Sequence, residues 1–479
     1  MRMAFALHPD DTALSRSRLL VRPAGTRPKS RPLRLVWHDT ANRDLRAEGL
    51  TLEEQRGLWS LQRLMGDGPS SEPALLATSR RRDDLPLPTP EALAPIATFE
   101  GRQTSFSVTR GEGETLALTL LRGSTNQKPI ARLILSGPDA LVRDLALALA
   151  ATFRLTIPKA SLASEAIASS EETDPPPRHL GPPAPATAAS VAVAFAQALG
   201  QLTDVLLHFA PIAAAGGADP EPVHQMRVAV RRARSTIQAV RGALDGPTLA
   251  AADRDLKALG AVLGPTRDWD VLVTETLPRV AAALPDDARL PRLAKAAQVR
   301  RAHHQAALAA YLDSPALRQL GIALAWLCAS DAWHAELAPA QREASTLPPA
   351  SFAAPVLQRR WKKLRATGKH LATLDAADLH AVRLRTKRAR YAMEVFRPAT
   401  DDKQADRLLR RLATLQQRLG TLNDGAVAGA LLAELGGARG RHGYAIGLVL
   451  GFLAAAAAAA RPGITRAGRK FRGAARFWA

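Results

Sequence analysis

The sequence of 479 residues has little cysteine and few aromatic residues: Cys328 is the only cysteine, and Phe, Trp and Tyr make up 4% of the chain. A single cysteine excludes an intramolecular disulfide and a cluster of thiolate metal ligands. The scarcity of aromatic residues, beside abundant alanine and leucine, favours packed helices over a large β-sandwich. The N-terminus lacks the charged and then apolar pattern of a secretory signal. We therefore expect a cytoplasmic protein.

Long hydrophobic runs are also scarce. The run Tyr444–Ala460 has 17 uncharged residues and is rich in alanine. It is shorter and less hydrophobic than a typical membrane-spanning helix. We interpret it as a buried core helix and expect no membrane partner.

The motifs of several enzyme classes and metal sites are absent. The sequence contains no Gly-x-x-x-x-Gly-Lys-Ser/Thr loop, no His-x-x-x-His pair and no Cys-containing ligand set, which argues against a nucleotide-binding loop and against zinc. Asp268 and Asp270 form an Asp-x-Asp pair, which we interpret as helix caps or partners of nearby arginines. We expect no metal and no cofactor.

The charge is strongly positive and unevenly distributed. The net charge is +21 and the pI is near 11.1. Residues 1–157 contain 22 basic and 17 acidic residues, whereas residues 186–479 contain 41 and 23. Such an excess indicates a polyanionic partner: nucleic acid, an anionic membrane surface or polyphosphate. The partner is expected to bind the C-terminal part.

One segment of that part occurs twice. Val223–Ser235 reads VHQMRVAVRRARS, and Leu379–Tyr391, which begins 156 residues later, reads LHAVRLRTKRARY. A second pair, Leu263–Asp268 and Leu419–Asp424, keeps the same offset. An unbroken register between two landmarks indicates a duplicated helical unit.

Each copy places its histidine and three basic residues on one helix face, within a sector of about 80° at about 100° per residue. Like charges on one face lower helix stability, and a partner with closely spaced negative charge removes that penalty. A solvated basic face is the alternative interpretation, but the repetition favours an anion-binding site. The candidate residues are His224, Arg227, Arg231, Arg234, His380, Arg383, Lys387 and Arg390. Arg359 and Lys363 are weaker candidates, equally compatible with exposed surface cations.

The chain divides into three segments. Residues 1–157 are expected to be a mixed α+β domain, residues 158–185 a Pro- and Ser-rich linker, and residues 186–479 an all-helical domain with repeat units at about 186–345 and 346–479. Residues 66–90 are rich in glycine and proline and are expected to form a loop. Alternating apolar and polar residues predict strands, and a periodic stretch predicts a helix. The expected elements are strands at Leu33–His38, Trp59–Leu64, Thr104–Thr109, Thr115–Leu121 and Ile130–Leu135 and a helix at Asp139–Phe153.

At the two basic helices the chain resembles the CHAD family, a helical domain named for its histidines. The likeness covers roughly residues 186–479 and rests on paired motifs at matching register. The resemblance implies an all-α domain of two pseudo-symmetric four-helix bundles. It also implies inorganic polyphosphate bound in a basic groove, and association with polyphosphate granules. The eight residues named above are the binders by position.

Residues 1–157 resemble a CYTH domain, the triphosphate-tunnel β-barrel, through Trp37-His-Asp-Thr40 and the leucines that follow. The sequence departs from the CYTH family at the positions that bind metal and phosphate in that family. The opening strand Met1–Leu7 has no carboxylate, Glu53 and Gln55 replace paired arginines, and the late acidic strand reads Arg132-Leu-Ile-Leu135. Acidic pairs there would hold a divalent metal, and inward cations would hold the phosphates. We therefore interpret this domain as a smaller, degenerate CYTH-like barrel.

Three functions remain open. The first is polyphosphate binding by the helical domain, at granules in the cytoplasm. The second is a triphosphatase or polyphosphatase activity of the barrel, against which the missing carboxylates argue. The third is nonspecific nucleic-acid binding, which lacks an aromatic stacking surface and a known motif. We predict electrostatic polyphosphate binding that weakens with salt, by analogy with nucleic acids. It should strengthen at low pH if His224 and His380 gain protons near their reference pKa of about 6.5.

Overall fold

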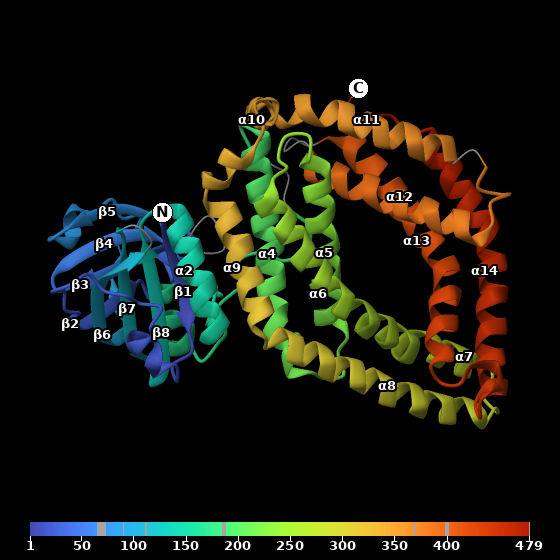
Figure 1. Cartoon of the computed structure of the whole chain (residues 1–479), viewed down its shortest axis with the longest axis horizontal. Helices are drawn as coiled ribbons and strands as arrows, with labels where there is room; N and C mark the ends of the chain where they lie inside the picture. The colour runs from blue at the N-terminus through green and yellow to red at the C-terminus, as the bar shows by residue number, and fades with distance from the viewer. Residues whose placement is uncertain are drawn as a thin grey trace. The chain divides into compact units, whose positions relative to one another are not determined.

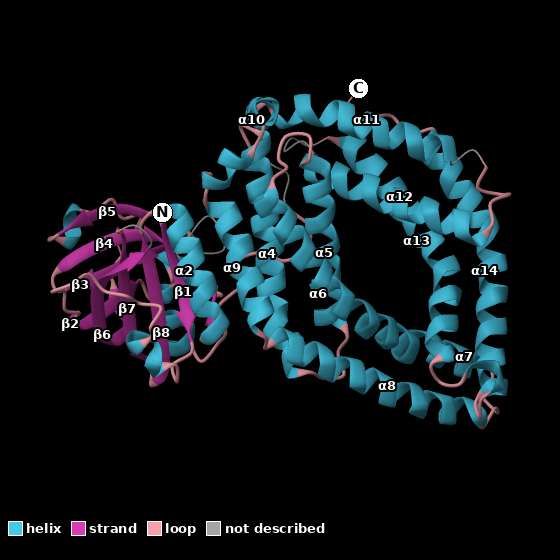
Figure 2. Cartoon of the chain, viewed as in Figure 1, coloured by secondary structure: helices cyan, strands magenta, loops and turns pink. Residues whose placement is uncertain are grey.

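The computed structural model describes residues 1–64, 73–89, 91–110, 113–183, 188–367, 370–397 and 402–478. The chain forms two compact units. Unit 1 comprises Met1–Leu180, Leu199–His208 and Asp313–Ala335, and unit 2 comprises Gly181–Ala198, Phe209–Leu312 and Glu336–Ala479. Unit 1 contains a nine-stranded sheet and unit 2 is helical (Figures 1 and 2). The predicted multidomain fold, an α+β domain before an all-helical one, is confirmed.

The sheet of unit 1 is antiparallel throughout, with strand order β5-β4-β3-β2-β6-β7-β8-β1-β9. The five expected strands overlap β2, β4, β6, β7 and β8, because alternation of apolar and polar residues marks a sheet with one face on the core. The strands are β1 (Arg2–Leu7), β2 (Lys29–Asp39), β3 (Leu50–Gln55), β4 (Leu58–Arg63), β5 (Leu75–Ser79), β6 (Ala94–Arg110), β7 (Glu114–Thr125), β8 (Lys128–Ser136) and β9 (Leu155–Thr156).

The segment expected to be a loop, residues 66–90, contains the strand β5 and a 3₁₀ turn, η2 (Arg82–Asp84). The loop prediction is therefore wrong over these elements. β5 forms because its backbone pairs with β4, in the register Trp59↔Ser79. The turn-forming residues on either side of β5 do not prevent this pairing. Gly66, Gly68, Pro69 and Pro90, on which the loop prediction partly depended, lie outside the described residues.

The expected linker, residues 158–185, contains the buried helix α3 (Leu162–Ser170). The Ser161 hydroxyl caps this helix by accepting a hydrogen bond from the Ser164 backbone N–H at 3.1 Å. Ala166 and Ile167 pack into a core with Trp37 and other residues of the sheet. The serines and acidic residues of this segment suggest a linker, but its apolar positions follow helical spacing. The linker prediction is thus wrong over α3, and residues 184–185 at its end lie outside the described residues.

Four further helical segments belong to unit 1: η1 (Thr12–Arg16), α1 (Asp44–Ala47), α2 (Asp139–Thr152) and α9 (Pro315–Ala329). α2 is the expected helix. α9 packs on α2, where Trp326 Nε1 donates to the Asp139 carbonyl oxygen at 2.9 Å and Arg318 Nε to that of Ala150 at 3.1 Å. Part of the first predicted repeat unit therefore belongs to the compact unit of the sheet.

Unit 2 contains the duplication. α5, α6, α8 and α4 have counterparts in α12, α13, α14 and α11, and each pair starts within two residues of the 156-residue offset. The helices are α4 (Val191–Ala215), α5 (Glu221–Val240), α6 (Pro247–Val271), η3 (Leu272–Thr276), α7 (Leu277–Ala283), α8 (Arg289–Leu312), η4 (Ala332–Glu336), α10 (Pro339–Thr346), α11 (Pro349–Thr367), α12 (Ala376–Val395), α13 (Lys403–Ala433), η5 (Gly437–Arg439) and α14 (Gly443–Arg472). Of these, η4 and α4 lie partly in unit 1.

The two repeats share one core. Trp269 and Leu293 from the first repeat lie in the same buried cluster as Leu432 and Val449 from the second. Burial of apolar surface contributes about 25 cal/mol per Å². The repeats are therefore held together by hydrophobic packing at the ends of α6, α8, α13 and α14.

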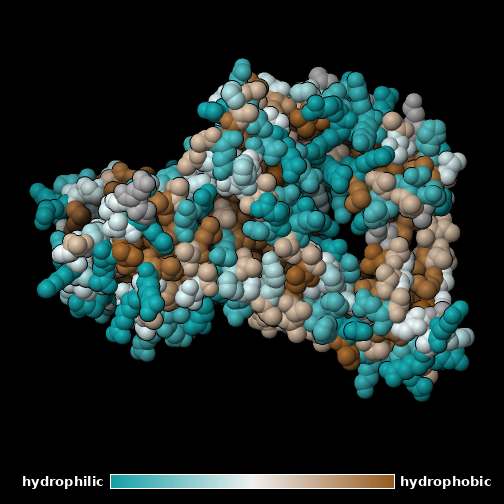
Figure 3. Space-filling model, in the orientation of Figure 1, coloured by the Kyte–Doolittle hydropathy of each residue, from teal (hydrophilic) through white to brown (hydrophobic). Residues whose placement is uncertain are grey.

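The run Tyr444–Ala460 lies in α14. Its first part is buried at Ala445, Ile446, Val449 and Leu453, but most of the alanines after Leu453 are exposed or partly exposed. The prediction of a buried core helix is therefore wrong for its second half, and Figure 3 shows apolar surface where α14 lies. Two helices, Val191–Ala215 and Gly443–Arg472, are long and apolar enough to cross a membrane by length and composition alone, which is weak support for a membrane span.

Candidate functional site

The two basic helices, α5 and α12, lie in contact in unit 2. Arg232 Nε on α5 donates to Glu394 Oε2 on α12 at 3.1 Å, and the Arg232 guanidinium lies 5.7 Å from the centre of the Tyr391 ring. At about 100° per residue, Arg232 points away from the face that holds the candidate residues of α5, and in the structure it contacts the other repeat instead. The two copies of the motif thus form one continuous surface.

A cavity of about 470 Å³, which we call the α5–α12 cavity, opens along these helices and α6. Four of the eight candidate residues line it: Arg227, Arg231, Arg234 and Lys387. Its other lining residues are Val230, Ser235, Gln238, Lys257, Gly260, Ala261, Gly264, Leu384, Arg388 and Tyr391. The lining contains six cationic side chains and no carboxylate among the described residues.

Three cations at this site are partly buried: Arg231, Lys387 and the nearby Arg383. Burial lowers the pKa of Arg231 and of Arg383, and burial together with the charges of Arg231 and Arg383 lowers the pKa of Lys387 to about 7. The Nε atoms of both arginines are buried with no hydrogen-bond partner in the described structure. Within that part of the chain, none of the three forms an ion pair. A partly buried cation without a counter-charge is unfavourable, so this cluster suits an anion.

Three other candidates have carboxylate partners. Arg227 Nη1 donates to the Gly264 carbonyl oxygen at 2.6 Å and to Asp268 Oδ1 at 2.8 Å. Arg234 Nε donates to Asp253 Oδ1 at 2.7 Å, and Arg390 Nε donates to Glu394 Oε1 at 2.8 Å. These pairs hold the guanidinium groups in place and neutralise part of their charge.

The two histidines are outside the cavity lining. His224 is half-buried, and its pKa is lowered by burial and then by the charge of Arg267. It is therefore neutral near pH 7. His380 lies on the exposed side of α12.

The weaker candidates Arg359 and Lys363 are exposed on α11 and do not line the cavity. Arg360, which directly follows Arg359, donates to the carbonyl oxygens of Arg388 at 2.7 Å and Gln238 at 3.3 Å. Arg360 thus supports two residues of the cavity wall.

Sequence reasoning missed Lys257 and Arg388. Lys257 has no basic counterpart at the duplicated position, which is Ala413, so comparison of the repeats does not find it. Arg388 directly follows Lys387 and lies outside the basic sector of an ideal helix. Only the packing of α5 against both α6 and α12 brings the two residues to the same cavity.

The Asp-x-Asp pair does not converge on one point. Asp268 pairs with Arg227, whereas the fully buried Asp270 accepts from Arg301 Nε at 2.6 Å. No group of three or more His, Cys, Asp or Glu residues that could hold a metal occurs in the described residues. The interpretation of these aspartates as arginine partners is confirmed.

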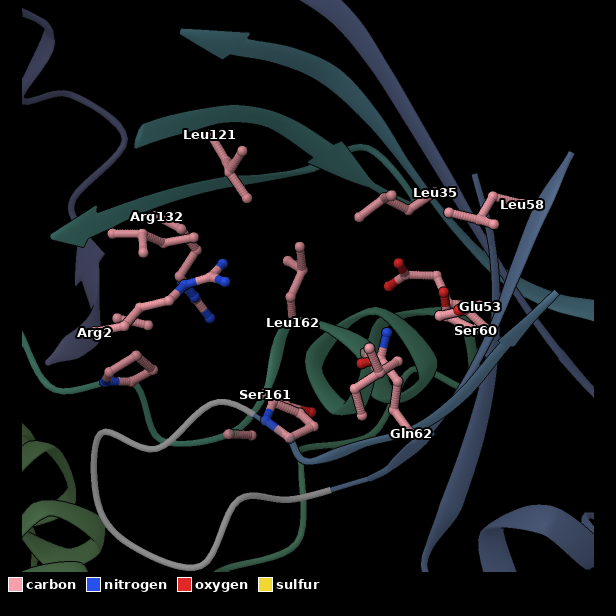
Figure 4. A pocket seen from close by; sticks show the side chains of 18 of the residues that line it. Arg2, Leu35, Glu53, Leu58, Ser60, Gln62, Leu121, Arg132, Ser161 and Leu162 are labelled. Atoms are coloured by element: carbon pink, nitrogen blue, oxygen red, sulfur yellow. The ribbon is translucent and has the colours of Figure 1, made fainter. Parts of the chain in front are cut away.

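A second cavity, of about 490 Å³, lies inside unit 1 (Figure 4). Arg2 and Arg132 lie at one side of it, Glu53 lies at the other, and Leu162 of α3 projects between them. Arg132 is almost fully buried and forms an ion pair with Glu165 of α3. The antiparallel sheet is consistent with a CYTH-like barrel whose interior is partly filled by α3.

The lining of this second cavity does not fit a divalent metal. Glu53 is the one carboxylate residue that lines it in the described structure, whereas such sites need several oxygen ligands. Asp39, in the segment that resembles the CYTH motif, has a structural role. Its Oδ1 accepts from the backbone N–H groups of Thr40 at 2.8 Å and Leu45 at 3.0 Å, which fixes the turn after β2.

Comparison with known proteins matches the helical region. The family model of the CHAD domain matches residues 196–433. The crystal structure of the CHAD domain from the plant Ricinus communis is 33% identical in sequence and aligns over 63% of this chain and 98% of that chain, with a TM-score of 0.52.

The structure of PptA from Streptomyces chartreusis is 17% identical and aligns over 59% of this chain and 100% of that chain, with a TM-score of 0.46. A search of curated proteins found no match. The duplicated basic helices, the matched region and the 33% identity over nearly the whole Ricinus communis domain together establish that this chain belongs to the CHAD domain family.

Proposed function

We propose that unit 2 binds inorganic polyphosphate in the α5–α12 cavity. The observation that carries this proposal is the partly buried cluster of Arg231, Arg383 and Lys387, which forms no ion pair among the described residues. A polyphosphate chain carries about one negative charge per phosphoryl unit. Its oxygens can accept paired hydrogen bonds from guanidinium groups and restore the protonated form of Lys387.

The lining of the cavity favours polyphosphate over nucleic acid. Proteins that bind single strands without sequence preference stack bases on aromatic side chains. Among the described residues, Tyr391 is the one aromatic side chain that lines the cavity, and it is 4% exposed. A ligand made only of phosphoryl groups needs no such surface. On this proposal the protein acts at polyphosphate granules in the cytoplasm, and a fluorescent fusion that stays diffuse in cells containing granules would contradict that location.

The binding test compares the double variant Arg231→Gln/Lys387→Gln with the control Arg292→Gln/Lys295→Gln. The control replaces one arginine and one lysine at exposed positions on α8. Long-chain polyphosphate is titrated across a salt series, with duplex DNA as competitor and phosphate release monitored with magnesium in the same samples. A hydrogen bond to a charged group is worth about 1.5–3 kcal/mol, so the double variant should lose at least about tenfold in affinity. The control should bind like the wild type.

Three results would count against the proposal. Equal affinity of the two double variants would remove the cavity as the site. Displacement of polyphosphate by duplex DNA at matched charge would show that the cavity is a generic basic surface without preference for polyphosphate. Release of phosphate would favour the alternative, an enzyme that uses unit 1.

A further inference from the structure

A second basic cavity, of about 400 Å³, lies between the first half of α13 and the last turns of α14. We call it the α13–α14 groove. It shares no lining residue with the α5–α12 cavity. Its lining residues are Arg407, Arg410, Arg411, Thr414, Ala467 and Lys470.

The charge of these two helix segments is strongly unbalanced. Residues 403–418 contain five basic residues and one acidic residue, Asp406, and residues 461–472 contain five basic and no acidic residues. Asp406 is already paired with Arg397 at 2.8 Å. In the described parts of the chain, none of the four cations that line the groove forms an ion pair.

This arrangement is costly without a ligand. Arg407 is followed by Arg410 at i+3 and Arg411 at i+4, so the three guanidinium groups lie on one face of α13. Like charges at this spacing destabilise a helix by about 0.2–0.5 kcal/mol per pair. The basic residues of the last turn of α14 have a conventional role at a helix C-terminus, but the arginines of α13 lie in the opposite half of their helix. An anion in the groove removes the repulsion.

Backbone contacts position the groove residues. Arg411 Nη1 donates to the Lys470 carbonyl oxygen at 3.0 Å and so connects α13 to α14. Arg407 Nε donates to the Lys403 carbonyl oxygen at 3.0 Å. Leu408 of α13 and Phe471 of α14 are fully buried, so each of the two helix segments is anchored in the core. Each guanidinium group has five N–H donors, so most donors remain available to a ligand.

We propose that the α13–α14 groove is a second phosphoryl-binding site, which engages a further stretch of the polyphosphate chain bound in the α5–α12 cavity. This inference rests on the proposed function. Along α13, Arg411 lies 13 residues before Asp424, whose charge acts on Arg383. At about 1.5 Å per residue, the distance from Arg411 to Asp424 along the helix axis is roughly 20 Å. A long polyphosphate chain spans that distance and a triphosphate does not. The described lining of the groove has no aromatic residue, so it offers no stacking surface for bases.

The test separates long chains from short ones. The triple variant Arg407→Gln/Arg410→Gln/Arg411→Gln is compared with Arg292→Gln/Lys295→Gln/Arg300→Gln, which removes three charges from exposed positions on α8. Binding of long-chain polyphosphate and of tripolyphosphate is measured across a salt series. Two linked sites bind one chain more tightly than either alone. The groove variant should therefore lose about tenfold or more for the long chain and nothing for tripolyphosphate. Its salt dependence, as log K against log salt, should fall in slope by about 2–3.

The possible failures are distinguishable. If the groove variant and the α8 variant bind the long chain with equal affinity and slope, the second site is wrong while the proposed function stands. If the groove variant loses affinity for duplex DNA but not for polyphosphate, the groove contacts nucleic acid and the inference is overturned. If the wild type binds neither chain length, the proposed function itself fails. Circular dichroism and thermal melting of each variant verify that its helical content and stability match those of the wild type.

Discussion

Arg232 on α5 and Glu394 on α12 form an ion pair that joins the two repeats, and both side chains are only 12% exposed. Glu394 also accepts from Arg390, so two guanidinium groups share one carboxylate. Glu394→Gln should lower the free energy of unfolding by about 1–3 kcal/mol, because a partly buried arginine loses its charged partner. It should also tighten polyphosphate binding, since Arg390 becomes available. Denaturant unfolding and titration with polyphosphate measure the two effects.

The matched control is Glu343→Gln, which removes the same charge from an exposed position on α10. It should leave stability unchanged, because exposed charges contribute little. Equal stability of the two variants would show that the Arg232–Glu394 pair does not hold the repeats together.

Lys387 predicts a pH dependence of binding near neutrality. Its pKa in the folded protein is lowered to about 7 from 10.5, by burial and then by the charges of Arg231 and Arg383. Above pH 7 the folded protein holds Lys387 mostly neutral, and bound polyphosphate favours the protonated form. Binding should therefore take up a proton, and affinity should fall as pH rises from about 6.5 to 8.5. Calorimetric titration in two buffers of different ionisation enthalpy measures this uptake.

Lys387→Arg is the control for that experiment, because an arginine stays charged over the whole range. Its affinity should vary less with pH than that of the wild type. Any remaining change with pH comes from titration of the ligand's own phosphate groups. His224→Asn should leave the pH dependence of affinity above pH 7 unchanged, since the pKa of His224 is lowered from its ordinary 6.5. A pH dependence that disappears in His224→Asn but persists in Lys387→Arg would reverse the assignment.

The same unpaired cations predict a ranking among single variants. Arg231→Gln should weaken polyphosphate binding more than Arg234→Gln, although both residues line the cavity. Arg234 already donates to Asp253 at 2.7 Å, so part of its charge is committed within the protein. Affinities at one salt concentration test the ranking, and a larger loss for Arg234→Gln would show that the carboxylate pairs do not limit binding.

Much of the fold follows from patterns that are local in the sequence. The offset between the basic helices predicts the duplicated helices, and alternation predicts five strands of the sheet. β3 and β5 are missed because their pairing with β4 decides their conformation. α3 is missed because its composition resembles a linker, whereas its burial comes from contacts with distant strands. The second half of α14 is misjudged because alanine periodicity does not reveal which face has a neighbour.

The candidate site shows the same contrast between features set by local sequence and features set by contacts between distant segments. The helical sector puts Arg231 and Lys387 on the basic faces of their helices, which depends on spacing within one helix, and both residues line the cavity. The partner of Arg232 lies 162 residues away, at Glu394. Lys257 reaches the cavity from α6. Relationships between separate helices of this kind decide which cations stay unpaired, and no periodicity within one helix encodes them.

A last prediction concerns Asp204 in unit 1. Burial raises its pKa to about 7 from 3.8, although the nearby Arg178 acts in the opposite direction. The folded protein therefore keeps a proton on Asp204 that the unfolded chain releases above pH 4. The stability from this group is present below pH 4 and is lost as pH rises to 7. Asp204→Asn has no proton to lose, so its melting temperature relative to the wild type should rise from pH 4 to 7 and then stay constant. A constant difference from pH 4 to 8 would mean that Asp204 is ionised throughout, and Arg178 would then be its fully charged partner.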